Sequence, residues 1–246
     1  MKRIAKFIIS GFNQLLWPAM CSGCSRRISE TNNKLCDKCW EQLLSSTAGY
    51  YCRRCGRDTS AYSIINGRCA QCQNEEIVFD SIARAGTYDN AFRKIILQFK
   101  SGQIQLKNQL SFLVNATIQG SEFFNEIDHI VPVPLHWKKR FIRGYNQAHI
   151  IASVLDGAKS KINTDLVRIK NTQAQFLLTP FKRKKNVEGA FTVRKDHDFT
   201  GKRICLVDDI KTTGATLNEC SRILKDAGAQ QVYALVLAVA GQNKDE

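Results

Sequence analysis

Long apolar runs are absent from this chain of 246 residues. Apolar residues do follow the basic start of segment 1–20, but Lys6, Asn13 and Gln14 interrupt them well short of the roughly 20 that a membrane span needs. Met20 is also too large for a signal-cleavage site, which favours small residues. We therefore expect a cytoplasmic protein with no membrane span, and an N-terminal amphipathic helix that packs on the protein. The apolar face of this helix would consist of Ile4, Phe7, Ile8, Phe12 and Leu15.

Acidic residues are scarce as well, with 22 Asp and Glu against 36 Lys and Arg and a formal net charge of +14. Such a surplus attracts polyanions, although a basic average by itself does not define a binding site. The proportions of hydrophobic (43%) and charged (24%) residues are ordinary for a soluble globular protein. At about 150 residues per domain, the length favours one large domain and a smaller module.

Cysteine is scarce beyond residue 72, where only Cys205 and Cys220 occur, and we expect both to be small buried residues. The other eight form four C-x-x-C pairs: Cys21/Cys24, Cys36/Cys39, Cys52/Cys55 and Cys69/Cys72. Two such pairs can complete a tetrahedral thiolate cage for a structural zinc ion, whereas disulfide frameworks rarely consist of C-x-x-C pairs alone. The spacing leaves two pairings open, a sequential one that resembles a double zinc ribbon and an interleaved one. Metal binding, on the order of 10 to 16 kcal/mol, would dominate the folding of this short module.

One stretch, Ile204–Thr216 with the sequence ICLVDDIKTTGAT, joins apolar, acidic and hydroxyl-bearing residues. Its apolar start predicts a buried parallel strand, and the apolar residues that follow at helical spacing predict a helix that ends near Gly228. Ligands of open α/β sheets lie at the carboxyl ends of strands, where a helix N-terminus offers unpaired N–H groups to an anion. The segment between this strand and this helix is therefore a candidate phosphate site.

The two halves of this stretch suit different ligand groups. Backbone amides, hydroxyls and a glycine that permits close approach can bind a phosphate at Thr212, Thr213, Gly214, Ala215 and Thr216. The ionised Asp208 and Asp209 only accept hydrogen bonds, so they suit sugar hydroxyls or a divalent cation. A phosphorylated ribose with Mg²⁺ satisfies both halves. A nucleotide triphosphatase would need a G-x-x-x-x-G-K-[ST] loop, which no segment supplies. Lys211 has no role in this interpretation, and we expect it to tolerate alanine.

This stretch resembles the phosphoribosyl pyrophosphate (PRPP) signature of type I phosphoribosyltransferases. The resemblance extends to the ComF family (ComF/GntX type) through VPVPLHWKKRFIRGYNQAHIIA, QFLLTPFKRKKNVEGAFTV and YDNAFRKIILQFKSG. It implies an α/β fold: a parallel-sheet, Rossmann-like phosphoribosyltransferase domain at residues 76–246, preceded by an N-terminal helix and double zinc-ribbon module at residues 1–75. The alternation of predicted strands and helices agrees with a parallel sheet. If the two modules are separate, Cys52→Ser should unfold the ribbons and spare the ribose-phosphate site.

The segment VPVPLHWKKRFIRGYNQA places cations after another predicted strand. Arginine offers a planar fork of donors for phosphate oxygens, and the helix that opens near Gly144 to Asn146 adds backbone amides. The resemblance makes this segment a pyrophosphate-binding loop, carried by Arg140, Arg143, Gly144 and Asn146. A solvated basic turn is the simpler alternative.

Residues 171–188 form the longest stretch without clear periodicity, and long loops in compact domains are often lids. Type I phosphoribosyltransferases close a mobile loop over the reacting centre, and Gln175, Arg183 and Asn186 match the family's pattern Q…R-x-x-N. The resemblance adds Arg183 to the aspartate pair as a candidate catalytic residue. A charged, flexible loop with no catalytic role is the alternative.

The resemblance as a whole implies an enzyme that binds PRPP with Mg²⁺, transfers its ribose 5-phosphate to an acceptor and releases pyrophosphate. In this transfer the anomeric carbon becomes cation-like, so the site must neutralise the leaving group, anchor the 5′-phosphate and exclude water. ComF-like proteins are associated with natural competence, which adds single-stranded DNA and other DNA-uptake proteins as expected partners. The alternative is a non-catalytic protein that binds PRPP and single-stranded DNA. No residue identifies the acceptor.

Overall fold

The computed structural model describes residues 19–28, 34–156, 160–172 and 179–241, so the expected N-terminal helix and Gln175 lie outside it. One parallel sheet of five strands organises the chain, and this confirms the predicted α/β fold. In spatial order the strands are β3 (Ser81–Thr87), β9 (Gln231–Val239), β8 (Arg203–Lys211), β4 (His129–Pro132) and β5 (Lys161–Ile162).

The central strand β8 is longer than its apolar run. It pairs with β4 up to Val207, and its pairing with β9 continues through the two aspartates to Lys211, opposite Val239. The strand β9 is buried along almost its whole length, which gives β8 a regular partner beyond its own apolar residues. The polar end of β8 is therefore held as strand backbone rather than as a loop.

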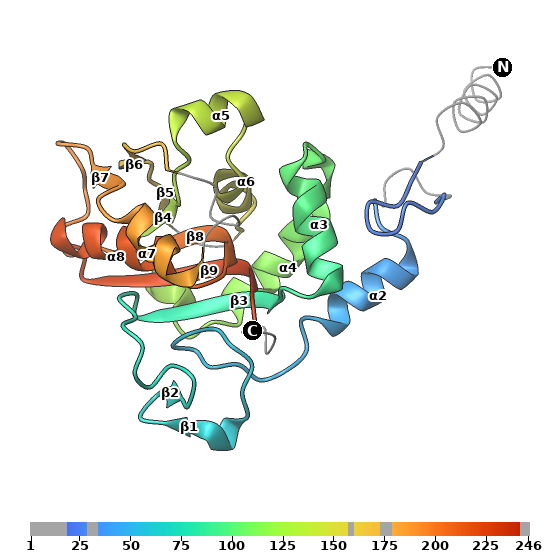
Figure 1. The fold of residues 1–246 in the computed structure, drawn as a ribbon, viewed down its shortest axis with the longest axis horizontal. Helices are drawn as coiled ribbons and strands as arrows, with labels where there is room; N and C mark the ends of the chain where they lie inside the picture. The colour runs from blue at the N-terminus through green and yellow to red at the C-terminus, as the bar shows by residue number, and fades with distance from the viewer. Residues whose placement is uncertain (1–18, 29–33, 157–159, 173–178, 242–246) are drawn as a thin grey trace.

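Helices lie on both faces of the sheet (Figure 1), and apolar side chains pack between them and the strands. One face packs against α3 (Asn90–Lys100), α4 (Lys107–Gln119) and α6 (Gln147–Ser153). The other face packs against α8 (Ala215–Asp226), which in turn contacts α7 (Pro180–Val187) and the antiparallel pair β6 (Leu166–Arg168) and β7 (Phe191–Val193). Short 3-10 helices lie at Ala61–Ser63, Ile104–Leu106 and Phe124–Glu126. Cys205 and Cys220 are fully buried, as predicted.

The segment 171–188 is not a continuous loop as the sequence suggested, because half of it is helix α7. Thr179 has the extended backbone of an N-cap, and Pro180 occupies the first turn. A proline fixes φ near the helical value and lacks the N–H that the first turn leaves unpaired anyway, so it starts a helix well. The sequence showed no apolar periodicity here because the helix consists largely of basic residues.

The two cysteine quartets lie in small modules on opposite faces of the sheet. We call residues 20–39 the first ribbon and residues 51–75 the second ribbon. The first ribbon leads into α2 (Asp37–Ser45) and packs on the face that carries α3 and α4. The second ribbon contains β1 (Ile64–Ile65) and β2 (Arg68–Cys69) and packs on the face that carries α8. Figure 1 shows the first in blue beside α3 and the second in cyan below β3.

The first knuckles of the two ribbons share one backbone geometry. In each, the N–H of the first cysteine donates to a carbonyl five residues on, Cys21 to Arg26 (2.8 Å) and Cys52 to Arg57 (2.9 Å). Ser25 and Gly56 occupy the same place in the two turns, with φ of 58° and 80°. The ribbons are thus a structural repeat that the two quartets predicted. In the part of the chain that the structure describes, no helix is both long and apolar enough to cross a membrane.

Candidate functional site

An aspartate pair lies at the carboxyl end of β8. The backbone N–H of Asp209 donates to Asp208 Oδ1 (2.9 Å), and Asp209 Oδ2 forms an ion pair with Lys100 Nζ (3.1 Å) at the end of α3. The Asp209 side chain is only 13% exposed. Burial, followed by the charge of Asp209, raises the pKa of Asp208 to about 7. Two adjacent, poorly hydrated carboxylates form a site that favours a cation or a group with several hydroxyl donors.

The predicted phosphate loop follows directly and reaches the first turn of α8. Gly214 is the N-cap and has a φ of 82°, in the left-handed region that favours glycine. Thr213 Oγ1 accepts a hydrogen bond from the N–H of Ala215 (3.4 Å), and no acidic residue lies in the first turn. The structure therefore brings the five predicted loop residues together beside the aspartate pair, at the positive end of a twelve-residue helix.

The segment predicted to bind pyrophosphate follows β4, the neighbour of β8 in the sheet. It forms helix α5 (Trp137–Arg143), which ends at Gly144 with a φ of 79°. Arg140 and Arg143 are exposed, and Arg143 donates to Gln147 Oε1 (3.1 Å). Asn146 instead caps α6, since its Oδ1 accepts from Ala148 N (3.1 Å). Asn146 therefore has a visible structural task, while the two arginines are available to an anion.

Two cations of this region, Lys100 and Arg168 at the end of β6, escaped the sequence analysis. A third, Lys139 on α5, was noted there among the cations after the predicted strand but was not assigned to the pyrophosphate loop. Lys139 Nζ donates to the carbonyl of Thr172 (2.8 Å), and the Arg168 guanidinium donates to the Thr172 hydroxyl and lies 5.1 Å from the centroid of the Phe191 ring. A signal was present for Lys100, which stands in the segment YDNAFRKIILQFKSG that carries the ComF resemblance, whereas no predicted element placed Arg168.

The cations of this region repel one another. Burial lowers the pKa of Lys139, and the charges of Arg168 and Arg143 lower it further. Burial also lowers the pKa of His136, followed by the charges of Lys138, Arg168 and Lys139. Arg168 Nε has no hydrogen-bond partner among the residues that the structure describes. Positive charge therefore gathers here, with Arg168 close enough to lower the pKa of Asp208, and a bound polyanion would relieve the repulsion among the cations.

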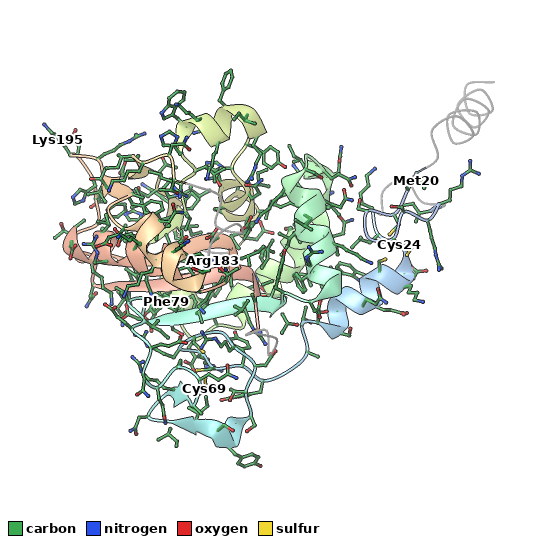
Figure 2. All side chains as sticks on the ribbon, viewed as in Figure 1. Met20, Cys24, Cys69, Phe79, Arg183 and Lys195 are labelled. Atoms are coloured by element: carbon green, nitrogen blue, oxygen red, sulfur yellow. The ribbon has the colours of Figure 1, made fainter. Side chains whose placement is uncertain are left out.

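Arg183 and Asn186 lie on α7, which packs against α8 (Figure 2). The backbone N–H of Arg183 donates to the carbonyl of Thr179 (2.9 Å), an ordinary helical bond. Arg183 is thus carried by a helix beside the one that opens with the phosphate loop. Its catalytic assignment stays a prediction.

Each cysteine quartet forms its own cage. The sulfurs of Cys21, Cys24, Cys36 and Cys39 gather within 4.8 Å of one another, and those of Cys52, Cys55, Cys69 and Cys72 do the same. The pairing is therefore sequential, and the interleaved alternative is wrong. Sulfur–sulfur distances of 3.6 to 3.8 Å match the edge of about 3.8 Å in a tetrahedron with metal–sulfur bonds of about 2.3 Å.

The two cages differ in their surroundings. Cys24 of the first cage is exposed, whereas all four cysteines of the second are at most 1% exposed. Burial raises the pKa of Cys21, but N–H groups of Cys36, Cys24 and Gly23 outweigh it and lower this pKa to about 7. Donors of this kind favour thiolates, the form that binds zinc.

Known proteins match both parts of the chain. The model of the double zinc ribbon domain matches residues 12–73, and that of the phosphoribosyl transferase domain matches residues 117–246, just over half of the chain. The chain belongs to the phosphoribosyl transferase domain family. Its domain with the aspartate pair and threonine-rich loop is therefore of the phosphoribosyltransferase type, and its two cages are those of a double zinc ribbon, which supports structural zinc.

Relatives of this phosphoribosyl transferase domain protein confirm the ComF resemblance. Competence protein F of Haemophilus influenzae is 29% identical over 89% of this chain and 96% of its own length. Competence protein ComFC of Bacillus subtilis is 26% identical over 80% of each chain. DNA utilization protein YhgH of Escherichia coli is 26% identical over 89% of this chain and 96% of its own length. A solved purine phosphoribosyltransferase from Pyrococcus horikoshii Ot3 is more distant, at 17% identity and a TM-score of 0.31 over 54% of this chain and 71% of that one.

Proposed function

We propose that this protein binds PRPP with Mg²⁺, transfers its ribose 5-phosphate to an acceptor and releases pyrophosphate. The observation that carries this proposal is the placement of an aspartate pair and a threonine-rich helix N-terminus at one end of the central strand, with a group of mutually repelling cations near Asp208. These three groups complement the ribose hydroxyls, the 5′-phosphate and the pyrophosphate of one ligand.

Each group has a defined task in the proposed transfer. The bond from the anomeric carbon to a pyrophosphate oxygen breaks, a bond from that carbon to the acceptor forms, and the acceptor loses a proton. Asp208 and Asp209 would hold the ribose hydroxyls, and the loop Thr212 to Thr216 would anchor the 5′-phosphate. Arg140, Arg143, Lys139 and Arg168 would neutralise the leaving group. Arg183 on α7 would help to exclude water.

The aspartate pair also fits a divalent cation. Carboxylate oxygens are the ligands that Mg²⁺ prefers, and Lys100 already pairs with Asp209 in the ligand-free protein. A bound Mg²⁺ would supply positive charge to the pyrophosphate as it leaves. Lys100 would then release Asp209 and turn to the phosphates. We further propose a cytoplasmic location, because eight zinc-binding thiolates persist in a reducing compartment.

Calorimetry of PRPP binding in the presence of Mg²⁺ tests the binding step. The double variant Asp208→Asn, Asp209→Asn keeps side-chain size and removes charge, so it should bind PRPP at least about tenfold more weakly, which is about 1.4 kcal/mol or more. Asp196→Asn, at an exposed position after β7, is the matched control. Wild-type protein that binds no PRPP, or a double variant that binds as tightly, would show that only the fold is shared. Pyrophosphate release across a panel of acceptors then tests catalysis.

A second candidate function is non-catalytic binding of PRPP and single-stranded DNA. Helix α5 favours it, because Trp137, Phe141 and Ile142 are 67%, 87% and 85% exposed there among basic residues. Exposed aromatic rings stack on unpaired bases, and neighbouring cations bind the phosphate backbone. The names of the relatives, which refer to competence and DNA utilization, agree with a role beside other DNA-uptake proteins.

An oligothymidylate and fluorescence anisotropy test this second candidate. Phe141→Ala should weaken binding, and the affinity of the wild type should fall steeply with added salt because phosphate contacts release counterions. Phe112→Ala is the control, since Phe112 is 61% exposed on α4. Binding that ignores salt, or that Phe112→Ala weakens as much as Phe141→Ala, would refute α5 as the DNA surface. Pyrophosphate release with any acceptor would exclude the non-catalytic form of this function.

A further inference from the structure

Lys211, to which the sequence assigned no role, is buried below the phosphate loop. It is the last residue of β8 and only 3% exposed. A Cβ on Gly214 would lie 3.1 Å from Lys211 Cε, so the lysine side chain fills the space against the loop. Lys211 Nζ has no hydrogen-bond partner among the described residues. A buried ammonium without a partner is costly, so a compensating negative charge should lie nearby.

The second ribbon carries negative charge of this kind close to Lys211. Burial lowers the pKa of Lys211 and the charge of Arg57 lowers it further, whereas Cys55, Glu75 and Cys72 raise it, and all four groups belong to the second ribbon. Four thiolates and one zinc ion together carry about two negative charges. Arg57, which is 7% exposed, is already paired with Glu75 (2.7 Å). Lys211 is therefore available to balance the cage itself.

Packing holds the cage at the same end of the sheet. A Cβ on Gly56, the residue after Cys55, would lie 2.9 Å from Val239 Cγ2, and Val239 is the strand partner of Lys211. The knuckle of the second ribbon thus lies directly on the strand ends next to the phosphate loop.

A second link ties the end of this ribbon to helix α8, which begins at the loop. Asn218 Oδ1 accepts from the N–H of Val78 (3.0 Å), and its Nδ2 donates to the carbonyl of Glu76 (2.9 Å). The first cage has no comparable position, because Cys21 and Cys39 pack with α3 and α4 on the opposite face. Figure 2 shows Cys24 and Cys69 in their separate ribbons.

We propose that Lys211 is a positioning residue that couples the second zinc cage to the phosphate loop. Its ammonium balances the charge of the cage, and its methylene chain supports the loop at Gly214. The loop therefore holds the 5′-phosphate well only when the second cage is loaded, while the first cage has no such effect. This inference rests on the proposed PRPP site. It replaces two expectations from the sequence, that Cys52→Ser spares that site and that Lys211 tolerates alanine.

The test measures the affinity for each end of PRPP separately. Calorimetry is carried out once with ribose 5-phosphate and once with inorganic pyrophosphate plus Mg²⁺. Lys211→Met keeps the length and packing of the side chain and removes its charge. This variant should bind ribose 5-phosphate about fivefold or more weakly than the wild type, and its affinity for pyrophosphate should stay within about twofold. Lys195→Met, at an exposed position, controls for net charge.

Zinc release gives a second readout that does not depend on ligand. In a Cys24→Ser, Cys36→Ser background, the released zinc comes from the second cage, and a colorimetric chelator should remove it faster when Lys211→Met is added. Cys24→Ser, Cys36→Ser alone should leave ribose 5-phosphate affinity unchanged. If the Cys52→Ser variant folds, its affinity for ribose 5-phosphate should fall. If it does not fold, the affinity of the Lys211→Met variant tests the coupling instead.

The outcomes separate this inference from the proposed function. Wild-type protein that binds neither PRPP nor ribose 5-phosphate overturns both. Wild-type binding together with unchanged ribose 5-phosphate affinity in Lys211→Met, or with unchanged zinc release, overturns the coupling alone. An equal loss of ribose 5-phosphate affinity on disrupting the first cage also overturns it, because the effect would then be general.

Discussion

The Asp208→Asn variant should be more stable than the wild type in neutral and alkaline solution, although its proposed binding of PRPP should weaken. In the folded, ligand-free protein, burial and the charge of Asp209 raise the pKa of Asp208 from 3.8 to about 7. At about 1.36 kcal/mol for each pH unit, holding this carboxylate ionised costs the folded state about 4 kcal/mol. Asparagine has nearly the same shape and never ionises, so it avoids that cost.

The sign of the pH dependence follows from linkage. A carboxyl whose pKa is raised by folding stabilises the folded state fully below its unfolded pKa of about 3.8, and loses that contribution as the pH rises toward 7. The advantage of Asp208→Asn should therefore grow with pH. Between about pH 5.5 and about pH 8 the predicted growth is about 2 kcal/mol.

Urea unfolding with zinc in excess, at several pH values, measures this difference in the free energy of unfolding. Comparing variant with wild type cancels the titration of the cages, which both proteins share. Asp196→Asn, at an exposed position, should give a difference that does not change with pH. If the difference for Asp208→Asn also stays constant from about pH 5.5 to about pH 8, the carboxyl is not held in a charge-disfavouring site and the electrostatic argument is refuted.

Three further predictions concern the metal, the cation beside the aspartates and the second ribbon. Metal analysis should find about two zinc ions per chain, and Cys52→Ser, in the buried cage, should lower the melting temperature more than Cys24→Ser, in the exposed one. Lys100→Ala should raise the pH midpoint of PRPP binding, measured by calorimetry over a pH series, because it removes a cation that lowers the pKa of Asp208. Arg54→Glu should unfold the second ribbon, since Arg54 donates hydrogen bonds to the carbonyls of residues 77, 79 and 80. Circular dichroism should show that the control Arg53→Glu, at an exposed position, folds like the wild type.

The features that could be predicted from the sequence are those formed by residues close together in the chain. The C-x-x-C spacing leaves little besides thiolate metal sites, and the run ICLVDDIKTTGAT combines a strand, a threonine-rich loop and a helix start within one continuous segment. The relative placement of residues that are neighbours in sequence can be predicted without knowing the rest of the fold. The aspartates and the threonine-rich loop were therefore located correctly relative to each other from the sequence.

Helix α7 shows where periodicity fails. Its basic residues give no apolar stripe, so the sequence suggested a loop, while Thr179 and Pro180 in fact start a helix. The catalytic assignment of Arg183, the pyrophosphate assignment of Arg140 and Arg143, and the domain boundary at residues 75 and 76 all remain predictions. Each depends on contacts with ligand or between modules, which residue types alone do not specify.

The sequence by itself determined the class of the fold, the two cysteine quartets and the residue types of the loop, because each of these is encoded by residues close together in the chain. Tertiary structure alone decided the pairing of the cysteines, since the spacing permitted two arrangements. It also decided that Lys100 on helix α3 reaches Asp209 on strand β8, that Arg168 joins the cations, and that Lys211 is buried between the loop and the second cage. Such contacts join residues far apart in sequence, and they arise only when the parallel strands bring their carboxyl ends to one edge.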